Sequence, residues 1–132
     1  MTCRLIFAAA ALLAGIAGTA QAASTPSCAA SGVVNSVVNR FDHYSHRYIG
    51  YPMTITAVED IHERRIERME KQYPVERRYC GASVVTSDGV RRKLWYLIER
   101  NFGFAGLGSS VEYCVSGLDR WHVHGAACKS LR

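Results

Sequence analysis

Apolar residues in the first half of the chain recur at spacings of three and four positions, while polar residues such as Asn35 and Asn39 fall between them. This spacing predicts one amphipathic helix over about residues 28–47. Ser27 or Ser31 is suited to cap its start, and Gly50 ends it. The apolar face consists of Val33, Val34, Val37, Val38, Phe41 and Tyr44.

The second half alternates apolar and polar residues in short runs, which predicts strands over residues 78–86, 92–99 and 111–115. Asp88-Gly89 is typical of a tight hairpin turn between the first two runs. Residues 94–98 are apolar at every position, so this strand is expected inside the sheet, with both faces covered.

Residues 53–69 fit two patterns. Charged pairs four residues apart, such as Asp60 with Arg64, are favourable on a helix. The β-branched run Thr54-Ile55-Thr56 instead favours a strand. We expect a strand over the first half of this segment and a charged connection ending at Pro74.

One N-terminal helix followed by about four antiparallel strands predicts an α+β roll, in which the helix covers one face of the sheet. Cystatin and nuclear-transport-factor folds share this architecture. A shared architecture carries no function by itself.

The first 22 residues have the three-part layout of a secretory signal. Arg4 precedes an apolar run over residues 5–18, and Ala20-Gln21-Ala22 offers a cleavage site. We expect cleavage near Ala22, a single domain over residues 23–132, and a periplasmic or secreted location. The alternative is an uncleaved membrane anchor. No transmembrane segment is expected after cleavage.

The chain has five cysteines, and loss of Cys3 with the leader leaves an even number. An even number in an exported chain predicts disulfides. Four cysteines allow three pairings, and spacing alone does not choose among them. The cysteines that remain are Cys28, Cys80, Cys114 and Cys128.

Strand alternation suggests a pairing. Cys114 lies on the opposite sheet face from Tyr113. If Tyr113 faces the helix, Cys114 faces away from it, and a bond to Cys128 then folds the C-terminal segment across that outer face. Trp121 is then expected near Trp95 and Leu97, which it covers. The other pair ties the helix start to a strand. The predicted disulfides are Cys28–Cys80 and Cys114–Cys128.

The formal net charge is +5, and loss of Arg4 with the leader lowers it by one. A mildly basic envelope protein attracts polyanions, so the expected partner is an envelope protein or a polyanion. Basic residues near Tyr79 and Trp95 resemble a nucleic-acid surface. Export argues against a nucleic-acid partner, and we expect none.

The densest group of functional side chains is Asp119, Arg120, Trp121 and His122. An acid beside a histidine suits proton transfer. The structural alternative is that Asp119 and Arg120 hold a turn while Trp121 packs. We treat the group as a candidate binding site and assign no catalytic residue.

Histidines at His43 and His46 share a helix face, and His122 and His124 share one side of an extended tail. Two such pairs make a zinc or copper site if they meet in space. Nothing in the sequence brings them together, so no metal and no cofactor is expected.

The second half of the chain contains the runs Glu76–Ala82, Ser87–Gly89, Trp95–Glu99, Gly103–Ala105, Val111–Val115 and Gly117–Trp121. With these runs it resembles a group of small exported bacterial proteins of unknown function. The resemblance covers about half of the chain, together with a Cys-led helix near Cys28, and implies no catalytic residue. It implies a strand near Ile55 and a shared four-cysteine layout.

These observations together predict a non-enzymatic binding or interaction module of the cell envelope. One alternative is a small enzyme or metal-binding protein that uses Asp119, His122 and His124. Another is an inhibitor of an envelope lytic enzyme or protease, for which a small disulfide-linked domain is suited.

Overall fold

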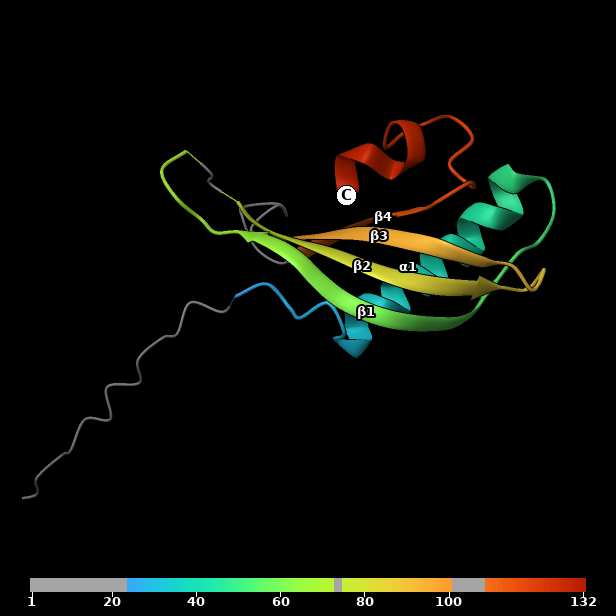
Figure 1. Ribbon diagram of the computed structural model, residues 1–132, viewed down its shortest axis with the longest axis horizontal. Coiled ribbons are helices and arrows are strands. Elements are labelled where there is room, and N and C mark those ends of the chain that lie inside the picture. Colours follow the sequence, from blue (N-terminus) through green and yellow to red (C-terminus); the bar gives the residue numbers. More distant parts are fainter. Residues whose placement is uncertain (1–23, 73–74, 101–108) are drawn as a thin grey trace, which may run out of the picture.

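The computed structural model describes residues 24–72, 75–100 and 109–132. Within these ranges an α-helix packs on a four-stranded antiparallel sheet of order β1-β2-β3-β4, which confirms the α+β class. Helix α1 lies on one face of the sheet, and the C-terminal segment lies on the other (Figure 1). The elements are α1 (Ser31–Tyr44), η1 (Ser45–Ile49), β1 (Ile55–Glu67), β2 (Glu76–Thr86), β3 (Arg91–Arg100), β4 (Ser109–Val115) and η3 (Ala126–Leu131). The leader predicted over residues 1–22 lies outside the described residues.

The predicted apolar stripe forms α1 and buries its centre against the sheet, with Val33, Val37 and Phe41 in the core. The chain continues as one π-helical turn, η1, and Gly50 ends it at a φ of 91°, a left-handed conformation that glycine adopts without strain. No helix in the described ranges is long and apolar enough to cross a membrane.

The predicted start of the helix is wrong. The helix begins at Ser31 rather than Cys28, and it is not N-terminal, because residues 24–30 precede it. Its N-cap is Ala30, and neither Ser27 nor Ser31 supplies a capping side chain in the described structure. The preceding residues are instead drawn toward β2: Arg78 donates hydrogen bonds to the hydroxyl and carbonyl oxygens of Thr25 at 3.1 and 3.3 Å.

Strand β1 continues through the charged residues to Glu67. The prediction of a charged connection after the first half of residues 53–69 is therefore wrong as far as Glu67. The strand accommodates its charges because β2 and β3 supply partners: Arg78 pairs with Glu63, and Arg91 pairs with Glu59. Asp60, with a φ of 54°, lies within a register shift that bends the strand.

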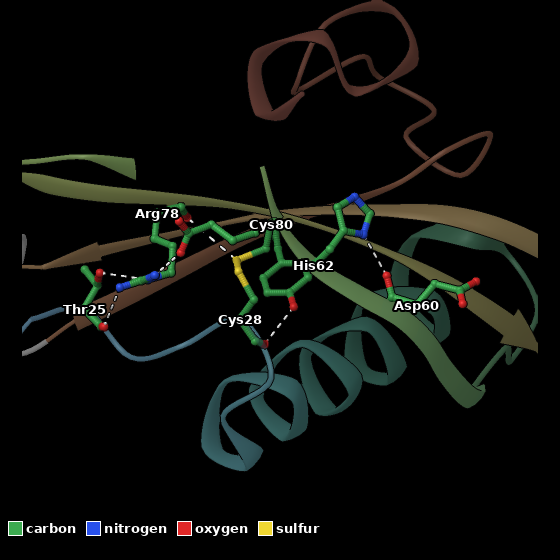
Figure 2. Close-up of a disulfide and its surroundings, with 8 residues drawn as sticks. Thr25, Cys28, Asp60, His62, Arg78 and Cys80 are labelled. Atoms are coloured by element: carbon green, nitrogen blue, oxygen red, sulfur yellow. Dashed lines mark hydrogen bonds and ion pairs between the residues drawn. A yellow bond between two sulfur atoms is a disulfide. The ribbon is translucent and has the colours of Figure 1, made fainter. Parts of the chain in front are cut away.

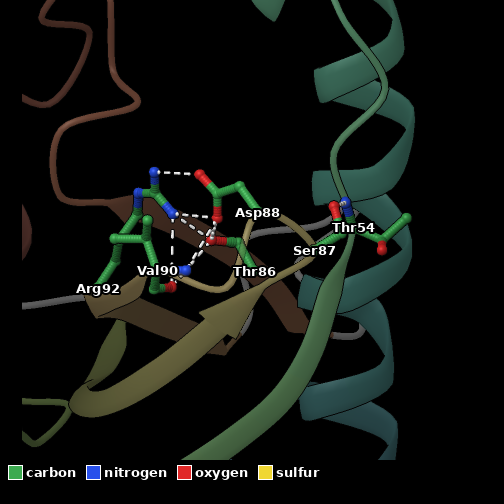
Figure 3. A network of polar contacts seen from close by, with 6 residues as sticks. All are labelled: Thr54, Thr86, Ser87, Asp88, Val90 and Arg92. Carbon is green, nitrogen blue, oxygen red and sulfur yellow. Dashed lines mark hydrogen bonds and ion pairs between the residues drawn. The ribbon is translucent and has the colours of Figure 1, made fainter.

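Asp88-Gly89 forms the turn between β2 and β3 as predicted, with Gly89 at a φ of 78°. Figure 3 shows the polar contacts around this turn. Arg92 donates to the Asp88 carboxylate at 2.7 and 2.9 Å, and the Thr86 hydroxyl donates to the same carboxylate at 2.6 Å. These bonds hold the pKa of the Asp88 carboxyl well below its usual range.

The disulfides join Cys28 to Cys80 and Cys114 to Cys128, the pairs that strand alternation predicts. Figure 2 shows the first of them, where it fastens the segment before α1 to β2. The Tyr96 hydroxyl donates to the Cys28 carbonyl at 2.7 Å inside the core and fixes the same segment to β3. Two disulfides indicate folding in an oxidising compartment.

Strand β3 is buried on both faces, as its apolar run predicts. Its helix-side residues join the main core, while Leu97 and Tyr79 form a second cluster on the outer face. Cys128 and Leu131 from the tail complete that cluster, with Trp95 partly buried against it. The prediction that Trp121 covers this face is wrong: its side chain is 60% exposed and packs elsewhere.

Candidate binding site

A pocket of about 510 Å³ lies beside β4, where the end of α1 meets the tail, residues 116–132. We call it the β4 pocket. Sites for small ligands commonly enclose about 300–1,000 Å³ and combine apolar walls with a few polar groups. Here α1, β4 and the tail each contribute to the walls. The lining residues are Arg40, Phe41, Tyr44, Glu112, Tyr113, Cys114, Val115, Leu118, Asp119, Val123, His124 and Ser130.

Asp119 is the member of the predicted cluster that lines this pocket. Its two carboxylate oxygens accept hydrogen bonds from the backbone N–H groups of Val123 and His124, each at 3.0 Å. The carboxylate therefore folds the tail into a turn beside β4. These contacts agree with the alternative prediction that Asp119 holds a turn. The residue also borders the pocket.

Arg120 and Trp121 lie next to the pocket rather than in its lining. The guanidinium of Arg120 is 5.8 Å from the Trp121 ring and donates to the Tyr48 carbonyl at 3.4 Å. Trp121 meets the Tyr48 ring edge-on at 5.7 Å, and Tyr48 is 5.3 Å from the ring of Tyr44. We call Tyr44, Tyr48 and Trp121 the aromatic cluster. Tyr44 lines the pocket, and Trp121, at the other end of the cluster, is exposed.

The two histidine pairs named above, His43 with His46 and His122 with His124, do not come together in one site. His43 and His46 are exposed on α1 and η1, and His46 Nδ1 lies 2.9 Å from the Asp42 carbonyl oxygen of its own helix. His122 is exposed, whereas His124 borders the pocket. Among the described residues, no group of three or more His, Cys, Asp or Glu side chains is placed to hold a metal ion.

The polar groups of the lining include two phenols and one guanidinium besides the carboxylates of Glu112 and Asp119. Arg40 donates to the Val111 carbonyl and lies 5.6 Å from the centre of the Tyr113 ring. Burial raises the pKa of Tyr113 to about 12. Burial and the nearby Asp119 carboxylate raise the pKa of Tyr44, whose hydroxyl donates to the Leu118 carbonyl at 3.4 Å. Both phenols are thus neutral at physiological pH.

Sequence reasoning located Asp119 but missed the pocket that it borders. Phe41 and Tyr44 belong to the predicted apolar helix face, and strand alternation puts Tyr113 on the opposite face from Cys114. The signal that could have found the pocket is Arg40. It is a charged residue directly beside that face, and its guanidinium reaches over the edge of β4.

The chain matches no protein-family model, no curated protein and no solved structure. The resemblance to small exported bacterial proteins therefore stays a prediction. The chemistry of the β4 pocket has to be argued from its own residues.

Proposed function

We propose that this protein is an exported, non-enzymatic binding module of the cell envelope and that the β4 pocket is its binding site. The observation that carries the proposal is a pocket of about 510 Å³ with apolar walls, two neutral phenols and an adjoining exposed aromatic cluster. Sites that recognise a partner typically combine exposed aromatic groups with a polar rim. The leader pattern at residues 1–22 and the two disulfides support export.

The polar groups of the pocket favour binding over catalysis. General acid–base catalysis needs a side chain free to reach the proton that it transfers. The Asp119 carboxylate instead accepts two backbone N–H groups of its own turn. This arrangement argues against the alternative in which Asp119 works with His122 or His124 as a small enzyme.

The charges of the pocket favour an envelope protein over a polyanion as the partner. Glu112 and Asp119 bring two carboxylates to the lining, while the guanidinium of Arg40 is directed at the Val111 carbonyl. A polyanion binding here would meet both carboxylates, and like charges at an interface disfavour association. The finer comparison of the roll with cystatin-like and nuclear-transport-factor-like folds belongs to the same proposal and adds no function to it.

Site-specific photo-crosslinking tests this function. A benzophenone amino acid replaces Val123, which lines the pocket and is 72% exposed. The matched control places it at Val90, a 46% exposed residue of the β2–β3 turn. Irradiated cells of the native host should yield a protein adduct of defined mass from position 123 and not from position 90. The absence of an adduct at 123, or the same adduct from both positions, would refute the proposal.

A further inference from the structure

Strand β4 lies at one edge of the sheet and pairs with β3 alone among the described strands. In an antiparallel pair, alternate residues direct their backbone groups at the partner strand, and the residues between them direct theirs away. The Ser116 N–H donates to the Lys93 carbonyl at 2.9 Å, which sets the alternation. Cys114 and Glu112 consequently bond to β3, while Val111, Tyr113 and Val115 direct their backbone groups outward.

Two of the outward carbonyls are already occupied. Arg40 donates to the carbonyl of Val111, and the Leu118 N–H donates to the carbonyl of Val115 at 3.0 Å. Among the described residues, the N–H groups of Val111, Tyr113 and Val115 and the carbonyl of Tyr113 have no hydrogen-bond partner. Tyr113 and Val115 also line the pocket.

The opposite edge of the sheet is protected against pairing. Charged residues and bulges are the usual devices that keep an edge strand from adding another strand. β1 carries charges over most of residues 59–67 and has register shifts around Asp60. β4 carries a single charge, Glu112, and its pairing with β3 shows no register shift. The outward backbone groups of Tyr113 on β4 are therefore unpaired among the described residues, whereas the β1 edge carries charges and register shifts.

The walls of the pocket decide what can add to β4. The end of α1, with Arg40 and Tyr44, stands on one side, and the tail, with Val123 and Ser130, stands on the other. Figure 1 shows α1 and the tail on opposite faces of the sheet. A second copy would bring its own α1 and tail to this edge in addition to a strand. A single extended segment brings no such layers, so it is the smaller occupant of the edge.

We propose that the β4 pocket binds an extended segment of its partner by β-strand addition, with the backbone of that segment paired to Tyr113. This proposal rests on the proposed function, because it specifies how the same pocket holds its partner. In strand addition, main-chain hydrogen bonds supply affinity and pockets for alternate side chains supply specificity.

The two faces of β4 define the side chains of that segment. Residues opposite Tyr113 point to the helix side, where Tyr44 and Leu118 favour apolar groups. Residues opposite Glu112 point to the other face. Glu112 is exposed, and no described cation pairs with it, so a lysine or arginine complements it there. The partner segment is therefore extended, apolar at alternate positions and basic between them.

Peptide selection followed by backbone methylation tests the mode of binding. Peptides are selected from a random phage-displayed library on the purified domain with both disulfides intact. Each backbone N–H of a selected peptide is then methylated in turn, and affinity is measured by fluorescence anisotropy. Methylation should weaken binding roughly tenfold or more at the residue whose N–H donates to the unoccupied Tyr113 carbonyl, because a lost backbone hydrogen bond adds to a steric clash. The two residues beside it in the peptide direct their N–H groups away from β4 and should change affinity by less than about threefold.

A pair of substitutions at one position supplies the control on the protein side. Tyr113→Ala removes the ring and keeps the outward N–H, whereas Tyr113→Pro removes both. Proline is tolerated on an edge strand where the N–H faces outward. Tyr113→Pro should bind the selected peptide more weakly than Tyr113→Ala. The melting transition of each variant is recorded to verify folding, and the methylation scan remains decisive if Tyr113→Pro does not fold.

The outcomes separate this proposal from the proposed function. Methylation that weakens binding no more at one residue than at its two neighbours, or equal affinities of the two Tyr113 variants when both fold, would overturn strand addition. Failure to select any peptide would also count against it. In each case the crosslink from position 123 decides on its own whether the pocket binds a protein partner.

Discussion

Truncation of Leu131 should destabilise the protein far more than truncation of Trp121, although tryptophan is the larger residue. Leu131 is 2% exposed and packs with Leu97, Tyr79 and the disulfide at Cys128. Leu→Ala in a core costs about 2–5 kcal/mol, depending on how well the site collapses. Since η3 is short and can settle partly into the space, we expect about 2–3 kcal/mol for Leu131→Ala.

Trp121→Ala removes a side chain that is 60% exposed and has an edge-on contact with Tyr48. An aromatic pair of this kind contributes about 0.5–1.5 kcal/mol, and exposure favours the lower end. We expect a loss of no more than about 1 kcal/mol for Trp121→Ala. The melting temperature should fall by about 4 °C per kcal/mol in a domain of this size, so Leu131→Ala should melt about 8–12 °C lower.

The assay is urea unfolding followed by far-ultraviolet circular dichroism, which does not depend on tryptophan fluorescence. Mass spectrometry verifies that both disulfides are intact in each variant, so that the comparison reports packing alone. The reasoning is refuted if Leu131→Ala lies within about 0.5 kcal/mol of the unsubstituted protein, the range typical of surface substitutions. It is equally refuted if Trp121→Ala costs as much as Leu131→Ala.

Three further outcomes follow from buried groups. Tyr96→Phe should cost about 1–3 kcal/mol in urea unfolding, because it leaves the Cys28 carbonyl without its donor. Burial raises the pKa of Tyr96 from 10.0 to about 12, so its contribution to stability is complete below pH 10 and is lost as the pH rises toward 12. The urea midpoint should fall across that interval, and less steeply in Tyr96→Phe; an equal slope contradicts the assignment. Gly81→Ala places a Cβ 2.8 Å from His62 Nε2, the outer end of an exposed side chain, and 3.2 Å from the Trp95 ring, so it should cost only about 1 kcal/mol; the part due to His62 should vanish in a His62→Ala background. Thermal melts of the four proteins in this cycle give the coupling, and additive effects would show that His62 is not the obstacle.

Much of the sheet is predictable from local pattern. Strands β2, β3 and β4 alternate apolar and polar residues or are apolar throughout, and the turn at Asp88-Gly89 separates the first two. Burial of one or both faces leaves such runs a single favourable register. The same alternation suggests the Cys114–Cys128 disulfide, because it can place Cys114 on the outer face, and Cys28–Cys80 is then the pair that remains; the structure has both.

The charged half of β1 could not be predicted in this way. Taken alone, its alternating charges are typical of a solvated connection. Their partners come from distant positions: Arg78 on β2 pairs with Glu63, and Arg91 on β3 pairs with Glu59. The guanidinium of Arg65 also lies 3.4 Å from the centre of the Tyr79 ring. A strand that is stabilised by cross-strand partners shows this only once its neighbours are known.

Only part of the candidate site could be predicted from the sequence, again because its residues come from distant positions. Asp119 attracts notice as an acid near histidines, but the β4 pocket exists only where α1, β4 and the tail converge. Arg40 and Tyr113 are separated by most of the described chain, and their contact at 5.6 Å depends on the helix crossing the edge strand. The spacing of residues along the sequence does not predict where a helix crosses a strand.

The tail shows why the size of a side chain is a poor guide to its position. Leu131 follows Cys128 by three residues, so it stays within about 10 Å of the disulfide and has to remain near the outer face. Trp121 precedes Cys128 by seven residues and lies within the turn that the Asp119 carboxylate holds. The smaller residue can close the outer face because the disulfide holds it there. Trp121 is left exposed against Tyr48, beside the β4 pocket. A large aromatic side chain that the core does not need is available to a partner, which is the role that the proposed function gives to the aromatic cluster.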